Sequence, residues 1–401
     1  MWVDKQRPVG EETILVSSQF LYLLLHTLSI ISEIEREERT PIMNQALRKF
    51  VPLLMEHYNR WIFNVPGPFQ VRGWGCRFNG KYVKSGMNHF EFLKMKLGKR
   101  LGDAESPAYC NAVQDLDMWI IAGVTNILAV CHRESLSISS EQYKKMLNYL
   151  KIGIKLLESR FTYTELKNFD GEPVIGAIFD RGAFDEQPSY AFAGYDGEEH
   201  PGIFSVPKSS QRGLGVGWDL SHARRFVHVF YTLFEFSDIL GLDFPTRDTI
   251  VKMGNQLVYG TFNRDFKKPL FTNFMDGTNG WYRVGYSGKT EYGHGPWDLS
   301  IAVLTGGYGL WSLYNPDVKK TFIAVIDMLK SNDPEIRKHV VEYYEKNARD
   351  YLQYYWNQSV WRGYKRFDGI DFNDNCNLYT ELVLIQFLPS ICFIKEYTGR
   401  F

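Results

Sequence analysis

The chain has 401 residues, of which 44% are hydrophobic, and its 46 Lys and Arg residues balance 46 Asp and Glu residues. This hydrophobic content excludes a disordered chain, and the balanced charge argues against nucleic acid or an anionic membrane as partner. The longest apolar stretches, around residues 20 to 31 and 118 to 131, are shorter than the roughly 18 residues of a membrane span. We therefore expect a soluble globular protein.

Apolar residues recur at three- and four-residue spacing along most of the chain, which predicts helices. In chain order the predicted helices cover residues 13–36, 41–63, 112–133, 140–160, 219–241, 247–263, 298–314, 316–330, 334–356 and 378–397. Thr40, Ser140, Asp317 and Asp333 lie at helix starts and are predicted capping residues. Sustained strand alternation is scarce, so the predicted fold class is all-α.

A short element occurs twice, as Trp-Asp-Leu-Ser at residues 218 to 221 and again at 297 to 300. Each copy follows a glycine-rich loop and precedes an apolar helix, with the Asp as predicted N-cap. We interpret the two copies as the same corner of stacked helical hairpins. About six or seven such hairpins would close into an α/α toroid, and because no linker divides the sequence we predict one catalytic domain over residues 1–401.

Three long loops, at residues 64–90, 168–217 and 271–297, are rich in Gly, Trp, Tyr, Arg and His. Loops longer than about 12 to 15 residues are uncommon unless they are functional or disordered. The aromatic content argues against disorder, so we interpret these loops as the walls of a binding cleft. The five cysteines stand at scattered spacings that imply no disulfide or zinc site. Residues 288–290 match only the end of a phosphate-binding loop, and residues 371–375 match only the start of a calcium-binding loop. We therefore expect no cofactor and no metal.

The loop at residues 279–295 interleaves cations, hydroxyls and an imidazole with glycines. Its chemistry-bearing residues are Arg283, Tyr286, Lys289, Tyr292 and His294. Such a mixture suits a sugar ligand, since aromatic faces stack on pyranose rings while cations bind hydroxyls and carboxylates. A tyrosine beside Arg283 or Lys289 has its phenolate favoured and can serve as a base. In the alternative interpretation, the tyrosines only form hydrogen bonds within a packed loop.

A second group of candidate residues begins the predicted helix at 219–241. His222 and Arg225 lie one turn into that helix, where side chains can face a cleft. His222 would bind a substrate carboxylate or act as a base, and its alternative is a buried histidine bonded to a carbonyl. The adjacent pair Asn88 and His89, which closes the first loop, is a third candidate for polarising a carboxylate.

The loop sequences resemble the α/α-toroid polysaccharide lyases, most closely the alginate and glucuronan lyases of family 38. The resemblance rests on NGWYRVGY at 279–286, TEYGHGPWDLS at 290–300, GGYGLWSLYNP at 306–316 and GWDLSHARR at 217–225. It implies β-elimination on a polyuronate: the carboxylate is neutralised, the C5 proton is removed and O4 leaves with a proton. No cofactor is needed for this chemistry.

The resemblance also implies roles for the candidate residues. Arg283, His222 and Asn88 would neutralise the carboxylate, while Tyr292, or as second choice Tyr286, would act as base and then acid. The remaining residues predicted to bind substrate are His89, Trp74, Arg181, Trp218, Arg225, Trp281, Lys289 and His294.

Two other functions stay open from sequence. A glycoside hydrolase would use two carboxyl groups from Asp180, Asp219, Glu291 and Asp298, and a glycan-binding module would bind sugar without cleaving it. For the lyase we expect an acidic polysaccharide as partner, with neither nucleic acid nor membrane. We expect export to the periplasm or medium, directed by a signal peptide that this sequence does not contain, with the cytoplasm as the alternative location.

Overall fold

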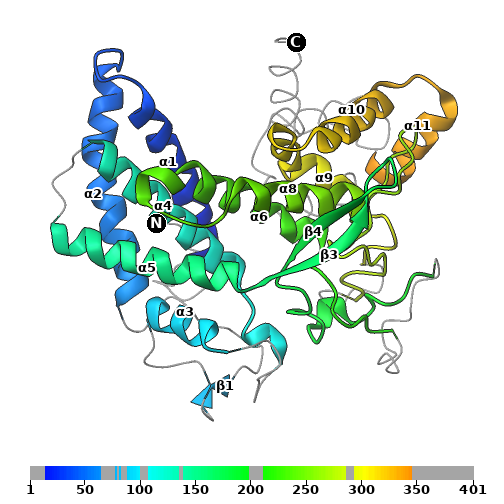
Figure 1. Cartoon of the computed structure of the whole chain (residues 1–401), viewed down its shortest axis with the longest axis horizontal. Helices are drawn as coiled ribbons and strands as arrows, with labels where there is room; N and C mark the ends of the chain where they lie inside the picture. Colours follow the sequence, from blue (N-terminus) through cyan, green and yellow to red (C-terminus); the bar gives the residue numbers. More distant parts are fainter. Residues whose placement is uncertain are drawn as a thin grey trace, which may run out of the picture. The chain divides into compact units, whose positions relative to one another are not determined.

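The computed structural model describes residues 14–64, 77–78, 81–82, 88–99, 107–134, 139–197, 211–285 and 293–345. These residues are mostly helical (Figure 1), which confirms the predicted helical class. The helices are α1 Ile14–Glu33, α2 Pro41–Phe63, α3 His89–Leu97, α4 Asp115–Glu134, α5 Ser140–Glu158, α6 Leu220–Glu235, α7 Ser237–Leu240, α8 Arg247–Asn255, α9 Ser300–Thr305, α10 Pro316–Lys330 and α11 Pro334–Val340. The strands are β1 Arg77–Phe78, β2 Lys81–Tyr82, β3 Phe161–Lys167 and β4 Pro173–Phe179.

The chain divides into two compact units. Unit 1 comprises Met1–Phe161 and His228–Arg247, and unit 2 comprises Thr162–Val227 and Asp248–Phe401. The boundary falls within α6. The single-domain toroid over residues 1–401 stays a prediction.

The core of unit 1 is built around α4, which packs against α1, α2 and α5. Every residue of α4 from Asp117 to Cys131 is buried, as expected of a helix that is apolar on all sides. Among the described helices, the stretch Ala108–Glu134 is long and apolar enough to cross a membrane, but 83% of its apolar window is buried inside the protein. Packing therefore accounts for its composition.

Unit 1 also encloses a polar network between α3, α4 and α5, in which all four side chains are fully buried. His89 Nε2 lies 2.9 Å from Asp117 Oδ1, its Nδ1 lies 3.0 Å from the Tyr149 hydroxyl, and Lys96 Nζ donates to Asp117 Oδ2. Burial alone would raise the pKa of Asp117, but Lys96 and His89 more than offset it and hold that pKa below its usual range. Burial lowers the pKa of His89. We call these four residues the Asp117 network.

The helix starts test the predicted caps. Thr40 and Asp333 cap α2 and α11 as predicted, each accepting a backbone N–H of the first turn. The other two caps were predicted too far along the chain: Ser139 caps α5 and Asn315 caps α10. In α10 Pro316 occupies the first helical position, where its missing N–H costs nothing, so the cap must be Asn315.

Strands β3 and β4 form a hairpin (Figure 1), so residues 173–179 of the loop predicted at 168–217 are a strand. The connecting turn is closed by Asn168, whose side chain accepts the N–H groups of Asp170 and Glu172. Gly171 supplies the left-handed residue of the turn, with φ +89°. Alternating Thr and Tyr in β3, followed by Asn-Phe-Asp-Gly, is the sequence signal for this hairpin.

The two Trp-Asp-Leu-Ser copies do not form the same corner. Asp219 caps α6, because its Oδ1 accepts the N–H of His222. Asp298 instead accepts the N–H of Gly295, and α9 begins only at Ser300. The interpretation of a repeated corner is therefore wrong. The predicted helix at 378–397 and the end of that at 334–356 lie outside the described residues.

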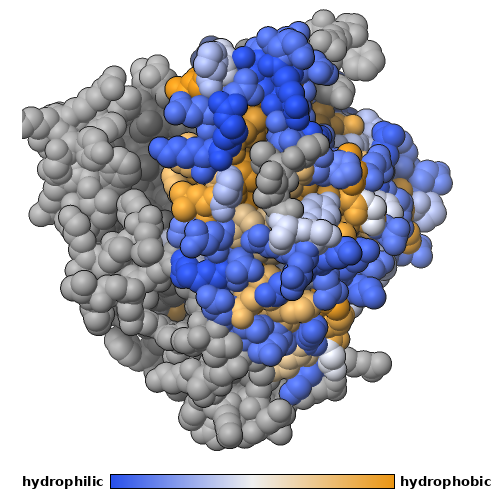
Figure 2. Space-filling model, turned by 90° about the vertical axis from the view of Figure 1, so that its left-hand side faces the viewer, coloured by the Kyte–Doolittle hydropathy of each residue, from blue (hydrophilic) through white to orange (hydrophobic). Residues whose placement is uncertain are grey.

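The surface of the described residues carries both hydrophilic and hydrophobic side chains. In the view of Figure 2 hydrophobic patches interrupt a mainly hydrophilic face. Large apolar side chains that are exposed include Phe20, Leu23 and Ile30 of α1.

Candidate functional site

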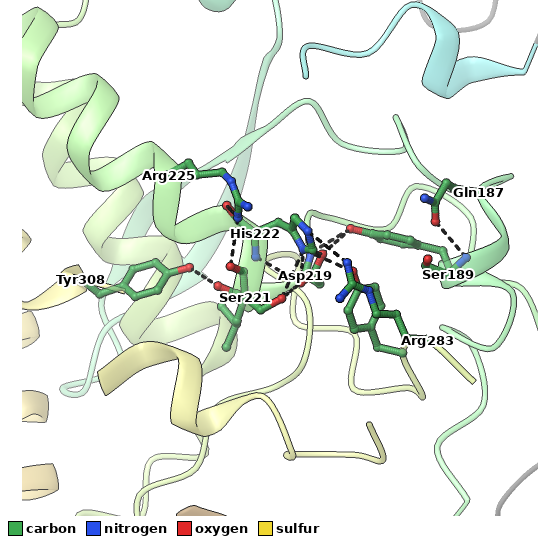
Figure 3. A network of polar contacts seen from close by, with 11 residues as sticks. Gln187, Ser189, Asp219, Ser221, His222, Arg225, Arg283 and Tyr308 are labelled. Atoms are coloured by element: carbon green, nitrogen blue, oxygen red, sulfur yellow. Dashed lines mark hydrogen bonds and ion pairs between the residues drawn. The ribbon is translucent and has the colours of Figure 1, made fainter. Parts of the chain in front are cut away.

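Six polar and aromatic side chains meet at the start of α6 in unit 2, and part of this network is drawn in Figure 3. We call it the His222 cluster. Four segments form it: a short helical turn Pro188–Tyr190, the start of α6 with the residue before it, and the two loops around residues 280–283 and 293–294. Its members are Tyr190, Asp219, His222, Tyr282, Arg283 and His294.

Backbone hydrogen bonds hold the segment 280–283 against its neighbours. The N–H of Arg283 donates to the carbonyl of Ser189 over 2.9 Å, and Tyr282 and His294 exchange two backbone hydrogen bonds of 2.8 Å each. Arg283 itself has φ +58°, a left-handed conformation that costs a non-glycine residue free energy. The surrounding hydrogen bonds thus impose the direction in which the Arg283 side chain leaves the loop.

Gly280 is required for this close approach, because a Cβ at that position would overlap the backbone carbonyl of Ala193. We expect Gly280→Ala to lower the free energy of unfolding by about 1–3 kcal/mol, since the backbone must move to make room. Urea denaturation measures the change. Gly98→Ala is the matched control: its Cβ would meet only ordinary contacts at 3.6 Å, so a change within about 0.5 kcal/mol is expected. Equal stabilities of the two variants would contradict the prediction.

Asp219 is the buried anchor of the cluster, with only 1% of its surface exposed. Its carboxylate lies 2.9 and 3.0 Å from Nδ1 of His222, accepts the hydroxyl of Tyr190 over 2.9 Å, and accepts the hydroxyl of Ser221. Burial alone would raise the pKa of Asp219, but interactions with His222, Ser221 and Arg283 more than offset it, so the pKa lies well below its usual range. Asp219 is therefore held as the carboxylate anion.

His222 connects this buried carboxylate to the surface, because 25% of its side chain is exposed. Its Nε2 lies 3.3 Å from Nη2 of Arg283, and its Nδ1 lies 3.2 Å from the hydroxyl of Tyr282. The guanidinium of Arg283 also lies over the Tyr282 ring, 5.2 Å from its centroid. The cluster thus places an imidazole, a guanidinium and a phenol in direct contact.

His294 completes the cluster by stacking on Tyr282, with ring centroids 6.1 Å apart and ring planes at 21°. Burial, together with the nearby positive charge of Arg283, lowers the pKa of His294 to about 4. His294 is consequently neutral at pH 7 and does not add positive charge beside Arg283.

This low pKa predicts a loss of stability in acid. Unfolded histidine has a pKa near 6.5. Between about pH 6.5 and pH 4 this residue is therefore protonated in the unfolded chain but neutral in the folded protein. The stabilisation is complete above pH 6.5 and is lost as the pH falls toward 4. Between pH 6.5 and pH 4, the wild-type protein should lose up to about 3 kcal/mol of its free energy of unfolding through His294, and His294→Gln should not show this loss. Urea unfolding at several pH values measures the difference. His132→Gln, at an exposed position, should leave the pH dependence unchanged; the prediction fails if His294→Gln does so too.

The structure brings three of the predicted site residues together: His222, Arg283 and His294. Trp281, predicted to bind substrate, lies beside them in sequence and is half-buried, with its indole N–H donating to the carbonyl of Gly197. The remaining candidates on the loops lie outside the described residues: Tyr286, Lys289, Tyr292 and Trp74.

Trp218 is not available as a subsite contact, which corrects the prediction. Only 2% of it is exposed, because its indole packs edge-on against Phe184 and Phe226. Arg225 turns back onto its own helix and donates to the carbonyls of residues 221 and 222. Arg181 is exposed and donates to the carbonyl of Gly215; among the described contacts it makes none with the His222 cluster.

Asn88 and His89 have structural roles in unit 1, which corrects their predicted role as substrate-binding residues. Asn88 caps α3 in a capping box with Glu91. His89 is fully buried, and both of its ring nitrogens face partners within the Asp117 network. Neither ring nitrogen is left to meet a ligand from solvent.

Sequence reasoning missed Tyr282 and Tyr190 as members of the site. Tyr282 stands directly before Arg283, and that adjacency was the available signal, although the predicted bases were the tyrosines further along the loop. Tyr190 gives no local signal, because it meets Asp219 across 29 residues of chain.

Comparison of the chain with protein-family models, with curated proteins and with solved structures finds no match. Within the described residues, no group of three or more His, Cys, Asp or Glu side chains is arranged to hold a metal ion. The function therefore has to be argued from the His222 cluster itself.

Proposed function

We propose that this protein is a polysaccharide lyase that cleaves a polyuronate, such as alginate or glucuronan, by β-elimination. One observation carries the proposal: an imidazole, a guanidinium and a tyrosine hydroxyl lie in contact at the start of α6, on a buried carboxylate. Elimination beside a carboxylate requires these groups, namely cationic or hydrogen-bonding partners for the carboxylate and a nearby base.

In this mechanism Arg283 binds the uronate carboxylate and stabilises the negative charge that develops on it as the enolate forms. His222 contacts both Arg283 and Tyr282 and holds them in place. Tyr282 acts as the phenolate, favoured by the adjacent Arg283 guanidinium, and its oxygen takes the proton from C5 while the C–H electron pair passes into the enolate. That pair then forms the C4–C5 double bond as the C4–O4 bond breaks with its electrons on O4, and the same tyrosine returns the proton to O4. Among the described tyrosines we assign Tyr282 this role, because its hydroxyl contacts His222 and its ring lies under Arg283. Only 2% of Tyr282 is exposed, so the mechanism requires the substrate to displace the side chains that cover its hydroxyl.

The cluster is less suited to a serine hydrolase. Ser221 donates its hydroxyl proton to Asp219, and the nitrogen of His222 nearest to it, Nδ1, also faces that carboxylate. Nδ1 lies 3.2 Å from the Ser221 oxygen but closer to the Asp219 carboxylate, which makes it a poor acceptor for the serine proton that nucleophilic catalysis would transfer.

The glycoside hydrolase alternative needs a carboxylic acid that is protonated near neutral pH. Asp219 is held ionised, Asp298 accepts a backbone N–H, and Asp180 is 1% exposed. The pKa of Asp185 is raised by burial, but its two oxygens accept the N–H groups of Gly215 and Val216. Glu291 lies outside the described residues. The carboxyl groups thus favour the lyase.

The toroid of about six or seven hairpins and the exported location belong to the same proposal. A helix-rich chain supports the toroid. Cys110 is disulfide-bonded, which supports an oxidising compartment such as the periplasm or the medium.

The test is ultraviolet absorbance of the unsaturated uronate product. The protein is incubated separately with polymannuronate, polyguluronate, glucuronan and a neutral glucan, and reducing ends are measured in parallel. Absorbance that rises on one polyuronate and not on the glucan is the expected result. New reducing ends without absorbance would favour the hydrolase, and binding without either signal would favour a glycan-binding module.

A further inference from the structure

The surroundings of His222 determine which of its ring nitrogens carries a proton. A carboxylate only accepts hydrogen bonds, and a guanidinium only donates them. Nδ1 lies against both oxygens of the Asp219 carboxylate, at 2.9 and 3.0 Å, whereas Nε2 lies 3.3 Å from Nη2 of Arg283. The neutral tautomer with its proton on Nδ1 satisfies both contacts at once.

The opposite tautomer would fail on both sides of the ring. A proton on Nε2 would point at the donating guanidinium of Arg283, and a bare Nδ1 would face the acceptor oxygens of Asp219. Two buried polar groups that face each other without a hydrogen bond cost free energy. The cost applies here because Asp219 is only 1% exposed, so water cannot supply the missing hydrogen bond.

Tyr190 keeps the Asp219 carboxylate in place. Its hydroxyl donates to Asp219 Oδ2 over 2.9 Å and accepts the backbone N–H of Asp219 over 3.0 Å. Tyr190 is 4% exposed and stacks on Phe184. Burial and the charge of Asp219 raise its pKa well above the usual range, so the hydroxyl stays a donor.

This tautomer also defines the relation of His222 to Tyr282. With its proton on Nδ1, the imidazole has no lone pair there to accept the hydroxyl proton of Tyr282, whose oxygen lies 3.2 Å away. His222 therefore does not remove the proton of Tyr282 through this contact.

We propose that Asp219, anchored by Tyr190, is a positioning residue that fixes His222 in the tautomer protonated on Nδ1, with Nδ1–H directed at Asp219 and Nε2 facing Arg283. The tautomer follows from the contacts alone, whereas its catalytic consequence rests on the proposed lyase function.

The test is a nitrogen NMR spectrum of the full chain labelled with ¹⁵N-histidine, recorded at neutral pH. His222 is assigned from the signals missing in His222→Gln. In the wild-type protein we expect Nδ1 to have the chemical shift of a protonated nitrogen and Nε2 that of an unprotonated one. A proton found on Nε2 would overturn the proposal.

Two variants then test the roles of the positioning groups. In Asp219→Asn we expect the proton to move to Nε2 in a substantial fraction of molecules, since the amide can turn its NH₂ group toward Nδ1. Tyr190→Phe keeps the ring and removes only the anchoring hydroxyl, so a smaller shift in the same direction is expected. The signals of His89, which pairs with Asp117 in unit 1, should not change in either variant.

An unchanged tautomer in Asp219→Asn would overturn the role of Asp219. If that variant does not fold, the wild-type spectrum and Tyr190→Phe decide the question, because an unchanged tautomer in Tyr190→Phe would overturn the role of the anchor. With an active polyuronate, Asp219→Asn should lower kcat by about 10²–10⁴-fold and change KM much less. A wild-type protein that has the Nδ1–H tautomer but cleaves no polyuronate would refute the lyase proposal and leave the tautomer assignment standing.

Discussion

Replacing Tyr282 by Phe should lower kcat on the cleaved polyuronate by about 10²–10⁴-fold, the usual contribution of a general acid–base group. The substitution removes only the hydroxyl that lies 3.2 Å from His222 Nδ1. The ring would keep its edge-on contacts with Tyr190 and Phe274 and its stacking on His294, so the stability should fall only by about 0.5–1.5 kcal/mol, the contribution of one hydrogen bond. The measurement is the initial rate of absorbance increase, compared at equal concentrations of folded protein.

Tyr149→Phe is the matched control for this prediction. Tyr149 is also buried and its hydroxyl also meets a histidine, at 3.0 Å from His89 Nδ1, but it belongs to unit 1. Its loss should cost about 0.5–1.5 kcal/mol of stability and leave kcat within about twofold of the wild-type value. A Tyr282→Phe enzyme as active as Tyr149→Phe would show that Tyr282 is not the base.

Local sequence was sufficient for the helices whose ends carry their own signals. Helix α2 has the predicted bounds because Thr40 and Pro41 fix its start and an amphipathic pattern continues to Phe63. The hairpin of β3 and β4 was missed, because the alternation in β3 is short and β4 lies within the loop predicted at residues 168–217. The predicted helix at 298–314 breaks after Thr305, where a left-handed Gly307 begins a tighter turn.

The candidate site was predictable only where it is local. His222 follows Asp219 by one helical turn, so its place at the start of α6 could be read from the sequence. Tyr282 depends on backbone pairing with His294 and on the hydrogen bond from Arg283 to Ser189, which no local pattern specifies.

The two errors at Trp218 and His89 have the same cause. Trp218 stands at the end of a glycine-rich loop, and this position suggested that its side chain is exposed. Aromatic side chains that lie far from it in sequence bury it instead. His89 closes a similar loop and is buried by Tyr149, which lies 60 residues away in sequence. A residue type at a loop end therefore indicates chemistry only when tertiary packing leaves its side chain accessible.

The largest stability change is expected at the Asp117 network. Asp117 and Lys96 form an ion pair in which both side chains are fully buried, and Asp117 also accepts the N–H of Gln114 and contacts His89. Asp117→Asn keeps the shape of the side chain but leaves the Lys96 ammonium buried without its carboxylate. Breaking a buried pair in this way costs about 3–5 kcal/mol, a large part of the 5–15 kcal/mol that stabilises a typical protein.

Urea unfolding at neutral pH measures this effect, and Asp248→Asn provides the matched control. Asp248 pairs with Lys252 one turn away on α8, but 67% of its side chain is exposed, so its loss should cost no more than about 1 kcal/mol. Adding Lys96→Met to Asp117→Asn should recover part of the lost stability, because the uncompensated charge is then removed as well. Equal costs for Asp117→Asn and Asp248→Asn would show that burial of the pair does not determine its contribution, and failure of Lys96→Met to recover stability would assign the cost to lost hydrogen bonds instead of to the ammonium.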